Sequence, residues 1–211
     1  MTWPHYAAQG KGLLDHPKIS RAHLTGGCMG CSPVIAFGVT YPETTLSMLL
    51  YWPVGGAKYR ISSHQRFAEH LTFVQQHGLD AVVDLVRKDG KPFGADPRGG
   101  PWASVIRHDS AFAATYAKQN IDQYKLVVTG MARTLFDRDT AAGAEPEDLL
   151  RFDRPALIVP GEDASHATSA ARYLQECLPL ADYWDAPVAA QTEEAATTRL
   201  LTFLDRVCVP A

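Results

Sequence analysis

The sequence predicts an α/β fold, in which a mostly parallel sheet of about four strands is flanked by helices and interrupted by a helical insertion. Three observations predict it. Residues 19–54 have the pattern of strand, sharp turn, helix and strand; residues 62–149 show helical periods only; and strands and helices alternate again from residue 154. Such alternation is typical of a parallel sheet whose faces are covered by helices.

The first unit begins with an apolar, β-branched stretch, ISRAHLT (residues 19–25), which stops at two glycines. The segment SPVIAFGVTY (residues 32–41) has the length and apolar character of a helix, and it ends before Pro42. The apolar run TTLSMLLYWPV (residues 44–54) is typical of a strand that is covered on both faces. Together these segments predict a βαβ unit.

The remainder of the chain divides into a helical middle and a second alternating part. Residues 62–149 carry helical patterns around a loop rich in proline and glycine. The segment RPALIVPG (residues 154–161) predicts a third strand, and HATSAARYLQECLP (residues 166–179) predicts a helix. A short strand is expected at residues 181–186, before an amphipathic helix at residues 191–207.

We therefore expect a single domain over residues 1–211. Its α/β core is predicted to comprise residues 1–56 and 150–211, with residues 57–149 as the helical insertion. A chain of 211 residues with 46% hydrophobic residues is long enough to bury one sizeable core.

Composition and charge exclude several classes of partner. The net charge is -3 and Lys and Arg form no cluster, so neither nucleic acid nor an anionic membrane surface is an expected partner. No apolar run approaches the roughly 20 residues that span a bilayer, and no secretory leader is recognisable. The four cysteines do not resemble a disulfide framework, so we expect free thiols and a cytoplasmic protein.

The stretch GGCMG, centred on Cys28, raises the main chemical question. Cys28 could be a catalytic thiolate, half of a redox pair with Cys31, a metal ligand or a small buried residue. A zinc site needs two further ligands at matching spacing, and no second Cys/His pair is present. Neither a metal nor another cofactor is therefore expected.

The motif Gly-x-Cys-x-Gly between a strand and a helix resembles the nucleophile elbow of the α/β-hydrolase fold, with Gly26 and Gly30 as the elbow glycines. Glycines there allow the strand and helix to approach closely. Residues 41–56 look like the following strand, and residues 154–166 like the strand that carries the catalytic acid. The resemblance covers about residues 13–207, with the helical insertion as a lid.

The resemblance implies a set of site residues. Cys28 would be the nucleophile, and the backbone N–H of Met29 would belong to the oxyanion hole. Asp163 would be the acid that orients the base, with Glu162 as the alternative. Alternatively, Asp163 would only cap the following helix, a role that Ser165 could serve equally.

Two features depart from the family's pattern. Residues 186–191, where the family's general base should lie, contain no histidine, so His166 is the best available substitute. Only about 20 residues precede the elbow strand, and the family's earlier strands are not found there. Without those strands, one edge of the elbow strand would be exposed. We therefore expect either a homo-oligomer or a complementing chain that covers this edge.

The leading functional hypothesis is a hydrolase of carboxylic esters or related acyl compounds that uses the Cys28 thiol. The alternative is a catalytically retired α/β-hydrolase-like protein that binds a small apolar ligand or a partner chain. Thiol redox chemistry at Cys28 and Cys31 is a third, weaker possibility. Even a correct fold leaves the substrate open, because this fold hosts many reactions.

Overall fold

The computed structural model describes residues 2–208, and the chain forms two compact units. The first comprises Met1–Arg60 together with Arg138–Ala211, and the second comprises Ile61–Asp137. The second unit lies wholly within the expected helical insertion at residues 57–149.

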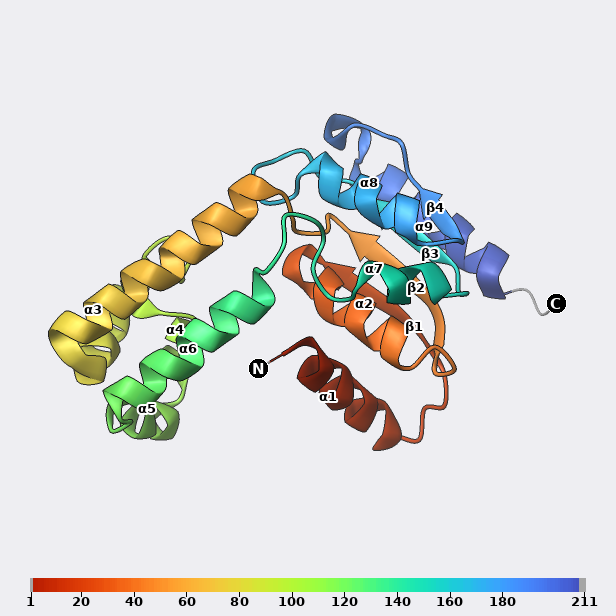
Figure 1. The fold of residues 1–211 in the computed structure, drawn as a ribbon. Coiled ribbons are helices and arrows are strands. Elements are labelled where there is room, and N and C mark those ends of the chain that lie inside the picture. The colour runs from red at the N-terminus through yellow and green to blue at the C-terminus, as the bar shows by residue number, and fades with distance from the viewer. Residues whose placement is uncertain (1, 209–211) are drawn as a thin grey trace. The chain divides into compact units, whose positions relative to one another are not determined.

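A four-stranded parallel sheet forms the centre of the first unit, in the order β1-β2-β3-β4 (Figure 1). The strands are β1 (Ala22–Gly27), β2 (Thr45–Tyr51), β3 (Ala156–Val159) and β4 (Ala181–Tyr183). The predicted sheet is therefore confirmed. Its order follows the sequence, although the helical second unit is inserted between β2 and β3.

Helices cover both faces of this sheet. Helices α2 (Cys31–Thr40), α7 (Pro146–Arg151) and α8 (Thr168–Cys177) pack on one face, and α9 (Glu193–Cys208) packs on the other. Coverage on both faces explains why the central strands are continuous apolar runs. All four residues of β3 are buried.

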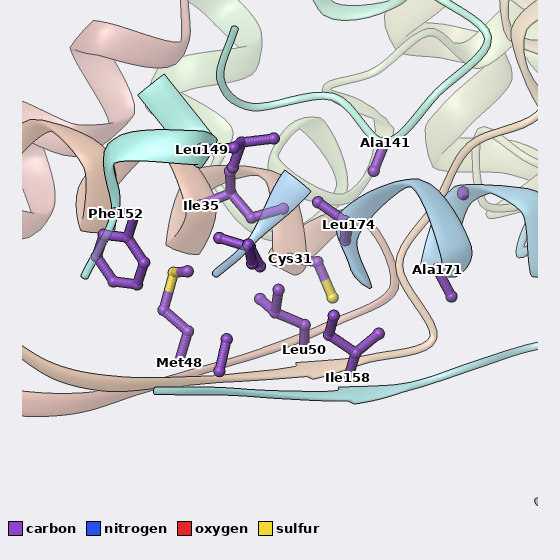
Figure 2. Close-up of a cluster of buried hydrophobic side chains, with 13 residues drawn as sticks. Cys31, Ile35, Met48, Leu50, Ala141, Leu149, Phe152, Ile158, Ala171 and Leu174 are labelled. Atoms are coloured by element: carbon purple, nitrogen blue, oxygen red, sulfur yellow. The ribbon is translucent and has the colours of Figure 1, made fainter. Parts of the chain in front are cut away.

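Alternate residues of the strands supply two separate apolar clusters. Leu50 and Ile158 join Ile35 of α2 and Leu174 of α8 in the larger cluster, which Figure 2 shows. Their neighbours on the opposite face form a smaller cluster around a buried aromatic residue of α9, and its buried members are Leu49, Leu157, Val159 and Phe203. The two clusters follow from the period of two along a strand.

Helix α1 (Trp3–Asp15) was not predicted from the sequence. Its residues Trp3 and Ala7 are buried, and it packs against α2. A Cβ built on Gly10 would lie 3.0 Å from Phe37 of α2, so the glycine brings the two helices close together. The glycines at positions 10 and 12 weaken the helical pattern of this segment, whereas proline is well tolerated in the first turn.

The second unit contains helices and short turns in its described residues, and no strand. Helix α3 (Ala57–Asp89) is broken at Gly78, where φ is 84°. It is followed by a 3-10 turn (Pro97–Gly99) and by α4 (Ala103–His108), α5 (Ser110–Ala117) and α6 (Ile121–Leu135). The side chain of Asn120 accepts a hydrogen bond from the backbone N–H of Gln123 and thereby caps α6.

A buried chain of hydrogen bonds crosses the second unit. The ring of His70 bonds the carbonyl oxygen of Arg98 through Nδ1 (2.9 Å) and the hydroxyl of Tyr124 through Nε2 (2.7 Å). The Tyr124 hydroxyl also bonds the hydroxyl of Tyr116 (2.7 Å). Burial lowers the pKa of His70, so the ring is held in its neutral form.

We expect Leu157→Ala to lower the free energy of unfolding by about 2–5 kcal/mol, because it removes a fully buried side chain between the sheet and α9. Leu201→Ala is the matched control, since Leu201 lies on α9 but is 55% exposed, and its effect should stay within about 0.5 kcal/mol. Urea denaturation followed by circular dichroism measures both. Equal effects would contradict the assignment of the core.

Candidate active site

Cys28 is held in an unfavourable backbone conformation directly after β1. It is the first residue of a 3-10 turn (Cys28–Gly30) that joins β1 to α2, and its φ is 55°. Residues with a side chain seldom occupy this left-handed region, and such positions concentrate at functional sites. The Cys28 side chain is exposed. The strand, turn and helix predicted around GGCMG are therefore present.

The two elbow glycines differ in what they contribute. A Cβ built on Gly26 would lie 2.4 Å from the carbonyl oxygen of Gly30, which is too close for any side chain. A Cβ built on Gly30 meets nothing within 4 Å. The close approach of strand and helix therefore requires a glycine at position 26, where the Gly30 backbone occupies the space, and not at position 30.

Three strands end at the same edge of the sheet as Cys28. Gly27 is paired with Tyr51, and Tyr51 with Val159, so β1, β2 and β3 finish level with one another. Strands in a sheet lie about 4.8 Å apart, which places the ends of β1 and β3 about 10 Å from one another. The loop that follows β3 therefore begins within side-chain reach of the same edge.

Asp163 and His166 form a hydrogen-bonded pair in the loop after β3. The Nδ1 atom of His166 lies 2.8 Å from Oδ2 of Asp163. Asp163 Oδ1 also accepts the backbone N–H groups of Ser165 (2.7 Å) and His166 (2.9 Å). The hydrogen bond from His166 and these N–H groups hold the pKa of Asp163 below its usual range.

Glu162, which the sequence left as the alternative to Asp163 for orienting the base, makes a different contact. Glu162 Oε1 accepts the backbone N–H of Val188 at 3.3 Å, and Val188 lies in a 3-10 turn (Val188–Ala190) after β4. Of the two adjacent carboxylates, Asp163 is therefore the one that holds His166. It does not cap α8, whose N-cap is Ala167 without a side-chain hydrogen bond; its backbone contacts to Ser165 and His166 order the loop before that helix.

The second ring nitrogen of His166 is buried and has no hydrogen-bond partner among the described residues. An ionised Asp163 can only accept, so Nδ1 of His166 carries the proton that it donates. In the neutral imidazole Nε2 then keeps its lone pair and is able to accept a proton. No hydrogen bond joins this nitrogen to Cys28 in residues 2–208.

Trp52 covers His166 from the end of β2. The two rings lie 5.7 Å apart between centroids, and Trp52 is a second residue with positive φ (52°) at this edge. Its Nε1 donates to Oε1 of Gln191 at 2.7 Å, and Gln191 in turn donates to the carbonyl oxygens of Pro160 (2.9 Å) and Ala186 (3.0 Å). An indole and an amide thus connect the ends of β2, β3 and β4.

Gln191 belongs to residues 186–191, the segment that contains no histidine where the family's general base should lie. Its contacts with Trp52 and Pro160 were not predicted, because a glutamine between alanine and threonine carries no sequence signal for a site. The single hint for Trp52 is its place directly after an apolar strand. Both residues are found through hydrogen bonds between distant parts of the chain.

The other residues of the turn have distinct environments. Met29, the expected oxyanion residue, follows Cys28 in the turn and its side chain is 36% exposed. Cys31 is buried, and its thiol donates to the carbonyl oxygen of Gly26 at 3.1 Å. Burial and the neighbouring Cys28 raise the pKa of Cys31 to about 12, which opposes the low thiol pKa that a redox-active pair requires.

Residues 2–208 contain no group of three or more His, Cys, Asp or Glu side chains arranged to hold a metal ion. No helix in this range combines the length and the apolar character needed to cross a bilayer.

Comparison with known proteins gives a match in structure alone. No family model and no curated protein matches the sequence. A putative non-heme bromoperoxidase from Mycobacterium tuberculosis H37Rv matches with a TM-score of 0.58 at 18% identity, covering 99% of this chain and 76% of that one. A thermophilic esterase from Thermogutta terrifontis matches with a TM-score of 0.57 at 17% identity, covering 99% and 74%. The chain has a partial α/β-hydrolase fold.

A third match is described as an α/β hydrolase enzyme from a Medee basin deep-sea metagenome library. Its TM-score is 0.53 at 17% identity, and it covers 97% of this chain and 71% of the other. The resemblance inferred from the elbow motif, the helical insertion and the acid-bearing strand is therefore confirmed at the level of the fold. At these identities the α/β-hydrolase fold is shown, and the chemistry has to be argued from the site.

We expect Gly26→Ala to destabilise the fold by about 1–3 kcal/mol, since the added methyl group would collide with the Gly30 carbonyl. Gly30→Ala is the matched control and should be close to neutral, because its Cβ points into open space and its φ is -63°. Thermal unfolding measures both. A neutral Gly26→Ala would show that β1 and α2 do not approach as described.

Proposed function

We propose that the protein hydrolyses carboxylic esters or related acyl compounds, with Cys28 as nucleophile, His166 as base and Asp163 as the residue that orients it. The observation that carries the proposal is the His166–Asp163 pair, which leaves Nε2 of His166 without a partner at the sheet edge that also bears the strained, exposed Cys28. A nucleophile, a base and a group that orients the base are the parts that acyl transfer requires.

The expected reaction has two stages. His166 Nε2 takes the thiol proton while Cys28 Sγ attacks the carbonyl carbon, and the Met29 N–H stabilises the oxyanion. The alcohol leaves with the proton from His166, and water then hydrolyses the thioester with the same base. Because Asp163 stays ionised, it stabilises the imidazolium that forms in each stage.

The position of Trp52 sets a condition on this mechanism. Nε2 of His166 is shielded and not bonded to Cys28, so a side chain at this edge must move before proton transfer. Hydrogen bonds of this kind are often long in free enzymes and tighten when substrate binds. The substrate class finds support in two structural neighbours, a thermophilic esterase and an N-acyl homoserine lactone degrading enzyme.

The same shielding supports a second candidate, a retired hydrolase that binds a small apolar ligand or a partner chain. In that case the indole of Trp52, fixed by Gln191, covers His166 permanently. Cys28 would then be an exposed thiol without a working base.

Hydrolysis of p-nitrophenyl acetate and butyrate distinguishes the two candidates. For a working hydrolase, Cys28→Ala should abolish turnover and His166→Gln should lower kcat by about 10²–10⁴-fold, the usual contribution of a general base. Cys177→Ala is the control, because Cys177 lies in α8 and is half-buried against the larger apolar cluster. Turnover that is unchanged in Cys28→Ala would exclude the hydrolase mechanism and favour the retired form.

We also propose that β1 pairs with a further strand, supplied by a second copy or by a complementing chain. In residues 2–208 no strand pairs with its outer edge, and natural proteins rarely leave such an edge uncovered. If a second copy supplies the strand, sedimentation analysis over a dilution series should give a mass above that of one chain. If a complementing chain supplies it, the chain alone should be a monomer whose β1 amides exchange rapidly with solvent. A stable monomer whose β1 amides resist hydrogen exchange would contradict this expectation.

A further inference from the structure

A second nucleophile with a histidine partner lies away from the candidate active site. Cys208, the last residue of α9, places its Sγ 3.3 Å from Nε2 of His23 on β1. The other ring nitrogen of His23 lies 2.8 Å from the hydroxyl of Ser47 on β2. Five residues of extended chain, about 16 Å, separate His23 from Cys28, so the two cysteines do not share one site.

The sheet register explains how this group is assembled. His23 and Ser47 are direct partners in the pairing of β1 with β2, and their side chains therefore lie on the same face. Ser47 precedes Leu49 by two residues, and Leu49 belongs to the cluster covered by α9. The end of α9 thus brings Cys208 to the face of the sheet that bears the imidazole.

Ser47 is the unexpected residue in this arrangement. It is completely buried within β2, where an unbonded hydroxyl would be costly. Its hydrogen bond to Nδ1 of His23 meets that cost and fixes the plane of the ring. Nucleophile, base and a group that orients the base are therefore all present at Cys208.

The hydrogen bonds also fit the charged form of the pair. When the thiol proton moves to Nε2 of His23, both ring nitrogens become donors, and the Cys208 thiolate and the Ser47 oxygen each accept one bond. The carboxyl end of α9 favours positive charge on His23 and disfavours negative charge on Cys208. The direct contact between Sγ of Cys208 and Nε2 of His23 is therefore the geometric basis for proton transfer.

The remaining cysteines lack this combination. Cys31 is buried with a pKa raised to about 12, and burial also raises the pKa of Cys177. Cys28 is exposed, but the candidate base His166 does not bond to it. Cys208 is exposed and, among residues 2–208, is the cysteine whose sulfur lies within hydrogen-bond distance of a histidine ring.

We propose that Cys208 is a reactive thiol that forms mixed disulfides with small-molecule disulfides, activated by His23. The Cys208 thiolate attacks one sulfur of the small disulfide, so that a new S–S bond forms as the original one breaks. The departing thiolate takes the proton from the His23 imidazolium. The products are a disulfide on Cys208, a free small thiol and a neutral imidazole.

The test measures how fast each cysteine reacts with oxidised glutathione at neutral pH, by quantitative peptide mass spectrometry. Cys208 should react first, and His23→Gln should slow it about tenfold, since an unassisted thiol is only a few per cent ionised near pH 7. His108→Gln is the matched control, because His108 is exposed and lies in the second unit. The rates at Cys28 and Cys177 should be the same in both variants.

A second measurement does not depend on the folding of a His23 variant. The ultraviolet absorbance of the thiolate in the native protein should fall in Cys208→Ser and stay unchanged in Cys177→Ser. The proposal fails if Cys208 reacts no faster than Cys28, if His23→Gln leaves its rate unchanged while the protein stays folded, or if Cys208→Ser leaves the thiolate absorbance intact.

Discussion

The parallel pairing of β2 with both of its neighbours is the constraint on which the first unit depends. Leu50 is paired with Gly26 on one side and with Ile158 on the other. This alignment sends alternate residues of β2 into two apolar clusters and ends three strands at one level. A slip of one residue would exchange the faces of Leu49 and Leu50 and separate the loops that carry the candidate site.

Much of the fold was predictable because its central strands are apolar runs with clear ends. The first three predicted strands and the βαβ unit needed only period, length and glycine breaks. Helix α1 was not predicted, since Gly10 and Gly12 weaken its pattern and its stability comes from packing against Phe37 of α2. The separation of α5 from α6 depends on the Asn120 cap, which is a contact of a single side chain.

The candidate site was predictable only in part, for a similar reason. Residues close in sequence, such as Asp163 and His166, could be proposed as partners because three positions separate them. The bond between Trp52 and Gln191 joins residues 139 positions apart, and neither residue type indicates the other. The contact of Cys208 with His23 likewise depends on where α9 ends on the sheet, and a local sequence pattern does not predict that position.

The buried hydrogen-bond chain of the second unit runs in one direction only. The Arg98 carbonyl can only accept, so Nδ1 of His70 must carry the proton, Nε2 must accept from Tyr124, and Tyr124 must accept from Tyr116. A second proton on His70 would turn Nε2 into a donor, so the Tyr124 hydroxyl would lose its acceptor and their bond would have to reverse. Because the pKa of His70 is lower in the folded state than its ordinary value near 6.5, unfolding takes up a proton as the solution becomes acidic. The helical unit therefore has its full stability above that pH and loses part of it as the pH falls towards the lowered pKa.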